Sequence, residues 1–241
     1  MVIAYHVIFS TYGFWLPNDP RGSWSDFVGA WELVRFGKAT KVSTTRSVAA
    51  APHDRRLRKQ AKETLHCQPV AFSGRQALAV GKGFAQAVRE SGYRVHACSI
   101  LPEHVHMIIG RSLRSIGRIV GHFKGRATQR LVADGLWPNT EHPVWGKKSW
   151  KVFVYSPERA QQAIAYVEAN PEKEGKPRQR WSFVRPFEPM APPASPERSP
   201  PRGGGSECPQ GSSGPRGTAN GTAAGGCPGP CRRPTGRNSG G

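Results

Sequence analysis

The sequence predicts an α+β domain in which helices pack against an antiparallel sheet. The expected order is strand, helix, two strands, helix, strand and helix, spread over residues 1–187. Two strands are separated only by Pro102 and Glu103, so they should pair antiparallel. The helical segments carry apolar side chains along one side, which is typical of helices that cover a sheet.

The first strand is expected at residues 5–11 (YHVIFST), which are mostly β-branched and aromatic. A turn follows at 18–22 (NDPRG). The next stretch shows no clear period, although 53–65 could form an exposed basic helix. This stretch of about 18–69 therefore stands outside the regular pattern.

The middle of the chain has stronger signals. Residues 73–91 repeat apolar side chains at helical spacing, with Ser73 as the expected N-cap and Gly92 as the C-cap. Strands are expected at 93–101 and 104–110. A second amphipathic helix is expected at 115–133, where one stripe is apolar.

The last two elements begin with equally local signals. Residues 150–155 (WKVFVY) suit a short strand. Ser156 and Pro157 then suit the N-cap and first position of a helix. This helix should run to about Asn170 and stop at Pro171, with Asn170 as its plain C-cap.

The chain is strongly basic. It has 35 Lys and Arg against 16 Asp and Glu, a formal net charge of +19. The first 187 residues hold 29 of the basic and 13 of the acidic side chains. This balance argues against an acidic-surfaced metabolic enzyme and favours a polyanionic partner such as nucleic acid.

The composition changes after residue 187. Residues 188–241 include 11 Pro and 13 Gly and no aromatic residue, so we expect a disordered tail. The five cysteines suggest no disulfide framework, and Cys227 and Cys231 are a weak zinc candidate.

With no apolar run of membrane-spanning length and no signal peptide, the expected location is cytoplasmic and nucleoid-associated.

The sharpest motif is the pair His104 and His106. Residues two apart on a strand share a face, so both imidazoles should point the same way while Val105, Met107 and Ile109 enter the core. Two imidazoles on one face can bind one metal ion. An isolated pair of this kind is more often structural, so the motif alone does not establish a site.

A second pair lies on the last helix. Tyr166 and Asn170 are four residues apart and therefore one turn apart, at the border of the apolar stripe. Alone, such a tyrosine is most often an ordinary core-edge residue. An amide one turn away could complete a metal site that holds a phenol beside the metal.

Three blocks of sequence follow one another along the chain in this order: YHVIFST, LPEHVHM and AYVEANPEKEG. Through these blocks the chain resembles the single-tyrosine transposases of the HUH endonuclease superfamily, which include the IS200-like and REP-associated tyrosine transposases. The resemblance spans about residues 1–187. It implies a ferredoxin-like antiparallel sheet, with about 18–69 as an insertion that is either a DNA-reading extension or a packed flap. It also implies that His104, His106 and Asn170 bind Mg²⁺ or Mn²⁺ and that Tyr166 is the catalytic nucleophile.

The implied reaction is metal-dependent nicking and strand transfer of single-stranded or hairpin DNA through a 5′-phosphotyrosine. Relatives act as monomers or as dimers that share the site in trans, so a homodimer is possible. His6 and His96 could lie near the site, but each reads more simply as a hydrogen-bonded sheet histidine. Basic residues near Trp145 and Trp150 or along the second helix are the DNA-binding candidates: Arg118, Lys124, Arg126, Arg130, Lys147, Lys148 and Lys151.

Two other functions stay open at this point. One is a nucleic-acid-binding protein on the same fold that no longer cuts DNA, a domesticated or decayed copy. The other is a zinc or iron hydrolase that uses the histidine pair with a carboxylate, although this would leave the basic charge without a purpose. The intact set of His104, His106, Tyr166 and Asn170 favours the transposase.

Overall fold

Four antiparallel strands form one sheet, with the order β2-β3-β1-β4. The computed structural model describes residues 1–44 and 48–188. The strands are β1 (Ala4–Thr11), β2 (Val95–Ile100), β3 (His104–Gly110) and β4 (Trp145–Val154). The helices are the 3-10 helix η1 (Trp31–Phe36), α1 (Arg55–Glu63), α2 (Gly74–Ser91), α3 (Ile116–Ala133) and α4 (Pro157–Lys173). Strand order and connections give the predicted ferredoxin-like arrangement.

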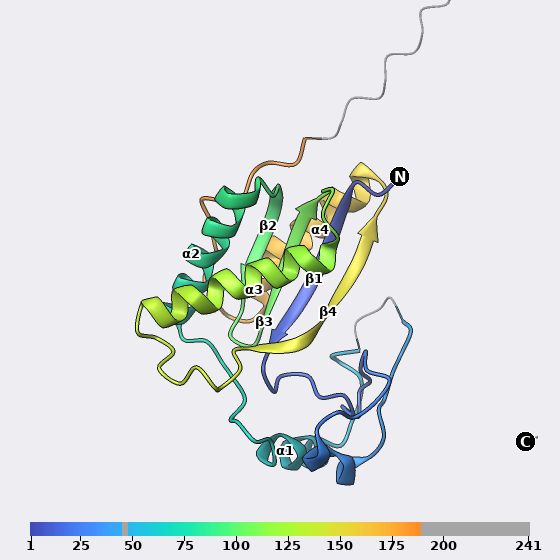
Figure 1. Ribbon diagram of the computed structural model, residues 1–241. Coiled ribbons are helices and arrows are strands. Elements are labelled where there is room, and N and C mark those ends of the chain that lie inside the picture. Colours follow the sequence, from blue (N-terminus) through green and yellow to red (C-terminus); the bar gives the residue numbers. More distant parts are fainter. Residues whose placement is uncertain (45–47, 189–241) are drawn as a thin grey trace, which may run out of the picture. The chain divides into compact units, whose positions relative to one another are not determined.

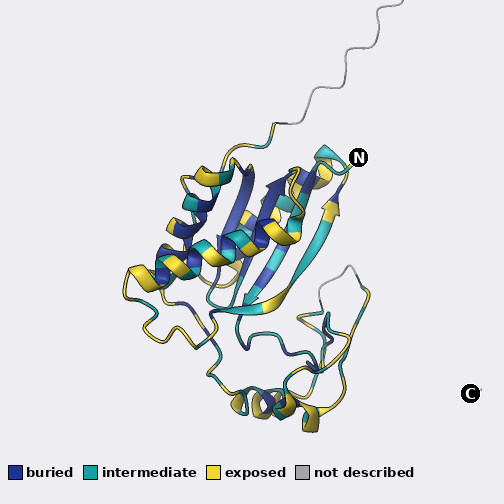
Figure 2. Cartoon of the chain, viewed as in Figure 1, coloured by how far each residue is buried: buried dark blue, intermediate teal, exposed yellow. Residues whose placement is uncertain are grey.

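The sheet lies between two helical layers (Figure 1), with α2 and α3 over one face and α4 over the other. The larger core fills the space under α2 and α3, where Phe9 meets Phe84 and Phe123 lies nearby. The smaller core lies under α4 and includes Ile108 and Val167. Strands β2 and β3 are almost wholly buried, whereas the edge strand β4 is mostly half-buried or exposed, as are the outer sides of the helices (Figure 2).

The alternation of side chains in the central strands decides which residues reach which layer. In β1, Val7 and Phe9 enter the larger core, so His6 and Ile8 face α4. Strand β1 pairs with β3 on one side and with β4 on the other. Side chains from all four strands meet under α4, since Ala4, Ala97, Ile108 and Val154 share the smaller core.

The caps of α2 are those that the sequence predicts. The Ser73 hydroxyl accepts a hydrogen bond from the amide of Gln76, whose side chain accepts one from the Ser73 amide. Gly92 ends the helix in the left-handed conformation. Helix α2 crosses α3 closely at Gly83, where a Cβ atom would lie 2.6 Å from the Cα of Ala127.

Two element boundaries differ from the prediction. Strand β4 begins at Trp145 rather than at 150, because the Trp145 ring packs on Phe9 and Phe72 and holds the preceding residues in the sheet. Helix α4 continues through Pro171 to Lys173, so Asn170 is not its C-cap. Pro171 has no N–H to donate to the carbonyl of Val167, and the end of the helix is held by the amides of Glu174 and Lys176, which donate to the Pro171 carbonyl.

The insertion has a small core of its own. Leu16, Leu33 and Ala61 are buried together between η1, α1 and the preceding loop. The Asp19 carboxylate, fully buried, pairs with Arg21 at 2.8 Å and with Arg58 at 3.2 Å. Burial would raise the pKa of Asp19, but its bonds to Arg21 and the charge of Arg58 hold that pKa below its usual range. The insertion is thus a packed element, joined to the sheet by contacts described below.

The predicted tail at 188–241 lies outside the described residues apart from residue 188, and so do Cys227 and Cys231. Among the described helices, none has the length and apolarity needed to cross a membrane.

Candidate active site

The histidine pair lies on the face of β3 that α4 covers. The rings of His104 and His106 have centroids 5.0 Å apart, while Val105 and Met107 point into the opposite core. The shared face therefore follows from strand alternation, as predicted. Phe14, from the loop after β1, stacks on the His104 ring with centroids 5.2 Å apart and closes one side of the pair.

A third histidine joins this pair. The Nε2 atom of His6 lies 3.1 Å from the Nδ1 atom of His106, within hydrogen-bond distance. In the register, His6 opposes Ile108 and His106 opposes Ile8, so the two imidazoles are diagonal neighbours across β1 and β3. The sequence reading of His6 as an ordinary sheet histidine therefore missed its contact with the site. His96 is such a histidine, with its Nδ1 near the carbonyls of Arg185 and Pro186.

Helix α4 runs along the histidines with one ridge of side chains. The Tyr166 ring lies 5.8 Å from that of His106 and 6.0 Å from that of His6, measured between centroids. Two turns later, the Glu174 Oε1 atom lies 3.7 Å from the His104 Nε2 atom. Asn170 is on the same ridge, one turn from each, and is buried. The ridge therefore places Asn170 between the ends of the histidine pair.

Burial keeps the imidazoles of this cluster uncharged at neutral pH. It lowers the pKa of His6 and of His104 to about 4. The pKa of His106 falls to about 2, mainly by burial and further through the charges that His104 and His6 would carry. Neutral imidazole is the form that binds metal ions. Nearby, partial burial and then Glu103 raise the pKa of Glu174.

Some of the unsatisfied polar atoms belong to this cluster or to its neighbours in the sheet. In the described part of the chain, five buried polar side-chain atoms have no hydrogen-bond partner, and they include His104 Nδ1, Asn170 Nδ2 and Ser99 Oγ. Ser99 pairs with His106 in the register of β2 and β3. Buried polar atoms are rarely left unpaired unless a ligand, ion or water meets them. A rotation of the Asn170 amide by half a turn would exchange its nitrogen and oxygen, so the oxygen would take the place of the unpaired Nδ2 atom.

These residues fit a divalent metal ion. Two neutral imidazoles and an amide oxygen are suitable ligands for Mn²⁺, and the predicted set is therefore His104, His106 and Asn170. Over residues 1–44 and 48–188, no three His, Cys, Asp or Glu side chains are arranged to hold a metal together. The predicted set contains only two such side chains, with the amide of Asn170 as its third member.

The tyrosine is open to solvent on one side. Tyr166 is 44% exposed although its ring contacts two histidines, so a large substrate can reach this residue. The Nζ atom of Lys173 lies 4.5 Å from the centroid of the Tyr166 ring. A cation over an aromatic face is held by the ring quadrupole and also brings positive charge close to the phenol.

The predicted DNA-binding residues divide between the two faces of the sheet. Arg118, Arg126 and Arg130 are on α3, across the sheet from the histidines. Arg126 pairs with Glu90, and Arg130 pairs with Asp134. The structure thus does not bring these arginines together with His104 and Tyr166.

The lysines lie along β4 or against it. Lys124 Nζ donates to the carbonyl of Gly146 at 2.7 Å and so ties α3 to β4. Burial, and then the charge of nearby Lys151, lowers the pKa of Lys124. Lys147 and Lys148 are both exposed. Lys148 alone of these four lies against the insertion, with its Nζ 3.3 Å from the carbonyl oxygen of Trp24.

Sequence reasoning assigned no role to three residues of the site: His6, Lys173 and Glu174. Glu174 continues the four-residue spacing from Tyr166 through Asn170, so the helical period could have suggested it. Lys173 follows Tyr166 by two turns and could have been found in the same way. His6 is 100 residues from His106, and only the strand register brings them together.

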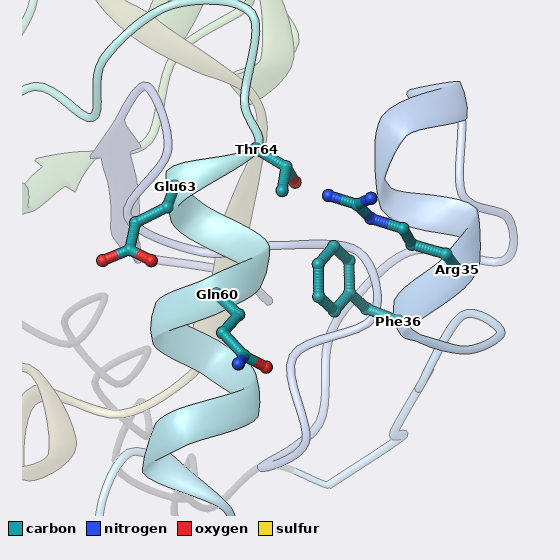
Figure 3. A pocket seen from close by; sticks show the side chains of 5 residues that line it. All are labelled: Arg35, Phe36, Gln60, Glu63 and Thr64. Carbon is teal, nitrogen blue, oxygen red and sulfur yellow. The ribbon is translucent and has the colours of Figure 1, made fainter.

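A separate pocket lies within the insertion. Arg35 and Phe36 of η1 face Gln60, Glu63 and Thr64 across it (Figure 3). None of these five residues belongs to the histidine cluster, so this pocket is not the site described above.

No protein-family model matches the sequence, and no curated protein matches it. Several solved structures do match, including the following two. One is the structure of a REP-associated tyrosine transposase bound to a REP hairpin. It is 13% identical in sequence, the match covers 72% of this chain and 68% of that chain, and the TM-score is 0.39. The other is the structure of a transposase candidate from Deinococcus radiodurans R1. It is 14% identical in sequence, the match covers 70% of this chain and 90% of that chain, and the TM-score is 0.37. Both likenesses are remote, so the proposal below rests on the geometry of the site.

Proposed function

We propose that the protein is a single-tyrosine transposase of the HUH superfamily that nicks and rejoins single-stranded DNA. One observation carries the proposal: a solvent-accessible tyrosine lies against neutral, buried imidazoles, with an amide one turn further along its helix. A phosphodiester is an anion, so its cleavage needs a nucleophile and positive charge at one place. Tyr166 supplies the nucleophile.

The oxygen of Tyr166 attacks phosphorus, and the bond from phosphorus to the 3′ oxygen breaks. The phenol loses its proton, and the leaving oxygen gains one to become a 3′-hydroxyl. The 5′-phosphotyrosine keeps the energy of the broken bond, so the 3′-hydroxyl of another strand can reverse the step. Strand transfer then needs no nucleotide cofactor.

His104, His106 and Asn170 would hold Mg²⁺ or Mn²⁺. When bound, such an ion polarises a non-bridging phosphate oxygen and offsets the charge that develops on it. Burial keeps both histidines neutral and so ready to act as ligands. Phe14 on the His104 ring and His6 on the His106 ring fix the orientations of the two imidazoles.

The substrate is expected to be a single strand or a strand next to a hairpin, as the resemblance of the three sequence blocks to the single-tyrosine transposases implies. Tyr166 and the three histidines come from one chain, so one copy can assemble the site in cis. A homodimer is compatible with this proposal but is not needed for the chemistry.

A cleavage assay tests the proposal. The full chain is incubated with labelled single-stranded hairpin oligonucleotides from the flanks of its own gene, with Mn²⁺ or with EDTA, beside the Tyr166→Phe variant. We expect an adduct between protein and DNA that survives denaturant and requires both the metal and Tyr166. Binding of these oligonucleotides without an adduct would instead support the non-cutting DNA-binding protein.

A further inference from the structure

Two tryptophans join the insertion to the edge of the sheet. Trp24, in the insertion, stacks on Trp150 of β4, with centroids 5.2 Å apart and planes inclined by 15°. Both side chains are only half-buried. Trp150 opposes Ile8 in the register, so it is on the face of the sheet that α4 covers and that carries the histidines.

The stacked pair continues the aromatic surroundings of Tyr166. The centroid of the Trp150 ring lies 6.5 Å from that of His6, and the His6 ring lies 6.0 Å from that of Tyr166. The rings therefore follow one another from the nucleophile through His6 and Trp150 to Trp24. We call Trp24, Trp150 and the neighbouring Phe27 the aromatic strip.

A cation and an exposed ring extend the strip at its outer end. Lys148 Nζ lies 3.3 Å from the Trp24 carbonyl oxygen and 5.9 Å from the centroid of the Phe27 ring. Phe27 is 68% exposed, although a phenylalanine gains stability by burial. Asp26 also lies here; its carboxylate is paired with Lys41 and also feels the charge of Lys148. Lys148 is itself exposed and presents its charge beside the Phe27 ring.

Rings interleaved with cations suit one class of partner. Unpaired bases stack on aromatic side chains, and the phosphates between them pair with lysine or arginine. A duplex keeps its bases stacked inside and would use only the charge. The charge of the insertion agrees, since residues 12–72 contain ten Lys and Arg against five Asp and Glu.

We propose that the aromatic strip, with Lys148, binds the single-stranded DNA that flanks the phosphate presented to Tyr166. The inference deepens the proposed function by assigning a substrate-binding role to the insertion. Bases of the flank stack on Trp24 and Phe27, and Lys148 pairs with a phosphate between them. The insertion thereby acts as a DNA-binding extension and is more than a cover for the sheet.

The test is a binding measurement that does not need cleavage. Fluorescein-labelled dT20 and a 20-base-pair duplex are titrated with the full chain in EDTA, and the fluorescence anisotropy is followed at several salt concentrations. The variants are Phe27→Ala and Lys148→Ala. Their matched controls are Tyr155→Ala, which removes a ring 59% exposed just beyond β4, and Lys147→Ala, which removes the adjacent charge on the same strand.

We expect Phe27→Ala and Lys148→Ala each to weaken dT20 binding about fivefold or more, whereas the duplex affinity changes only with Lys148→Ala. Lys148→Ala should also reduce the slope of log K against log salt by about 0.7, and Phe27→Ala should leave this slope unchanged. Tyr155→Ala should bind dT20 within about twofold of the unaltered chain, and Lys147→Ala should lose less than Lys148→Ala. Phe27 is exposed, so its loss should not impair folding.

Three results would overturn the inference. Unchanged dT20 binding by Phe27→Ala would show that the ring takes no part. Equal losses in Phe27→Ala and Tyr155→Ala would show a non-specific effect, and dissociation of a dimer by Phe27→Ala without loss of dT20 binding would identify a second copy as the occupant. None of these depends on cleavage, so the proposed function could stand while the inference fails. Loss of dT20 binding in Phe27→Ala, in a protein that never forms an adduct, would leave the inference standing without the nuclease.

Discussion

The Nε2 atom of His6 and the Nδ1 atom of His106 lie 3.1 Å apart, on neighbouring strands of the sheet. One of these two nitrogens must carry the proton that they share. If His106 donates from Nδ1, its Nε2 keeps a lone pair and can bind a metal ion. His6 would then act as a positioning residue that selects the tautomer of a ligand.

His6→Ala should therefore weaken Mn²⁺ binding about 10- to 100-fold, because the acceptor for His106 is lost. The measurement is a titration followed by the electron paramagnetic resonance signal of free Mn²⁺. His6→Gln keeps an acceptor at similar reach and should recover most of the affinity. The control is His96→Gln, on the neighbouring strand β2, which should bind Mn²⁺ normally. Normal binding by His6→Ala would contradict the tautomer role.

Lys173 should assist Tyr166. Its Nζ atom lies 4.5 Å from the centroid of the tyrosine ring, where positive charge stabilises the phenolate that forms during attack. Lys173→Met should slow adduct formation at saturating DNA by about fivefold, an estimate from the usual strength of such contacts at exposed sites. Lys173→Arg should keep most of the rate, and Lys176→Met serves as the control. A rate unaffected by Lys173→Met would remove this role.

The close crossing of α2 and α3 gives a prediction on stability. Gly83→Ala would place a Cβ 2.6 Å from the Arg126 carbonyl oxygen, so α2 and α3 must separate, at a cost of about 1–3 kcal/mol. The matched change, Gly121→Ala in α3, meets nothing within 4 Å. It should instead stabilise the protein by about 0.5–1 kcal/mol. Urea unfolding measures both, and equal stability of the two variants would contradict the described packing.

Lys124 makes stability depend on pH above neutrality. Burial, and then the charge of Lys151, lowers its pKa from 10.5 to about 8. Between these values the unfolded chain binds the extra proton, so the free energy of unfolding should rise as pH rises. Lys124→Met should lack this rise. Urea midpoints at pH 7.5 and 10 test it, and parallel profiles for the two proteins would show that Lys124 titrates normally when folded.

The sequence predicted correctly those features that depend on a few neighbouring residues. The alternation around His104 and His106 predicted their shared strand face, and the spacing of Tyr166 and Asn170 predicted their shared helix ridge. Ser73 and Gly92 likewise cap the two ends of α2 at the positions that the sequence predicted. Such features depend on a few neighbouring residues, so they can be read from a single chain.

Other features depend on contacts between distant residues. The start of β4 is set by Trp145 packing on Phe9, which the sequence around 145 does not reveal. The stacking of Trp24 on Trp150 joins an insertion without periodic pattern to the sheet edge. In each case the partner is far along the chain and only the folded structure identifies it.

Mapping the covalent bond tests the central claim most directly. The adduct formed with Mn²⁺ is digested with nuclease and protease, and mass spectrometry locates the remaining nucleotide. Our account predicts a nucleotide on Tyr166, joined through its phosphate, and none on the exposed Tyr155 in the same digest. Cleaved DNA with the nucleotide on another residue, or with no protein attached, would contradict it.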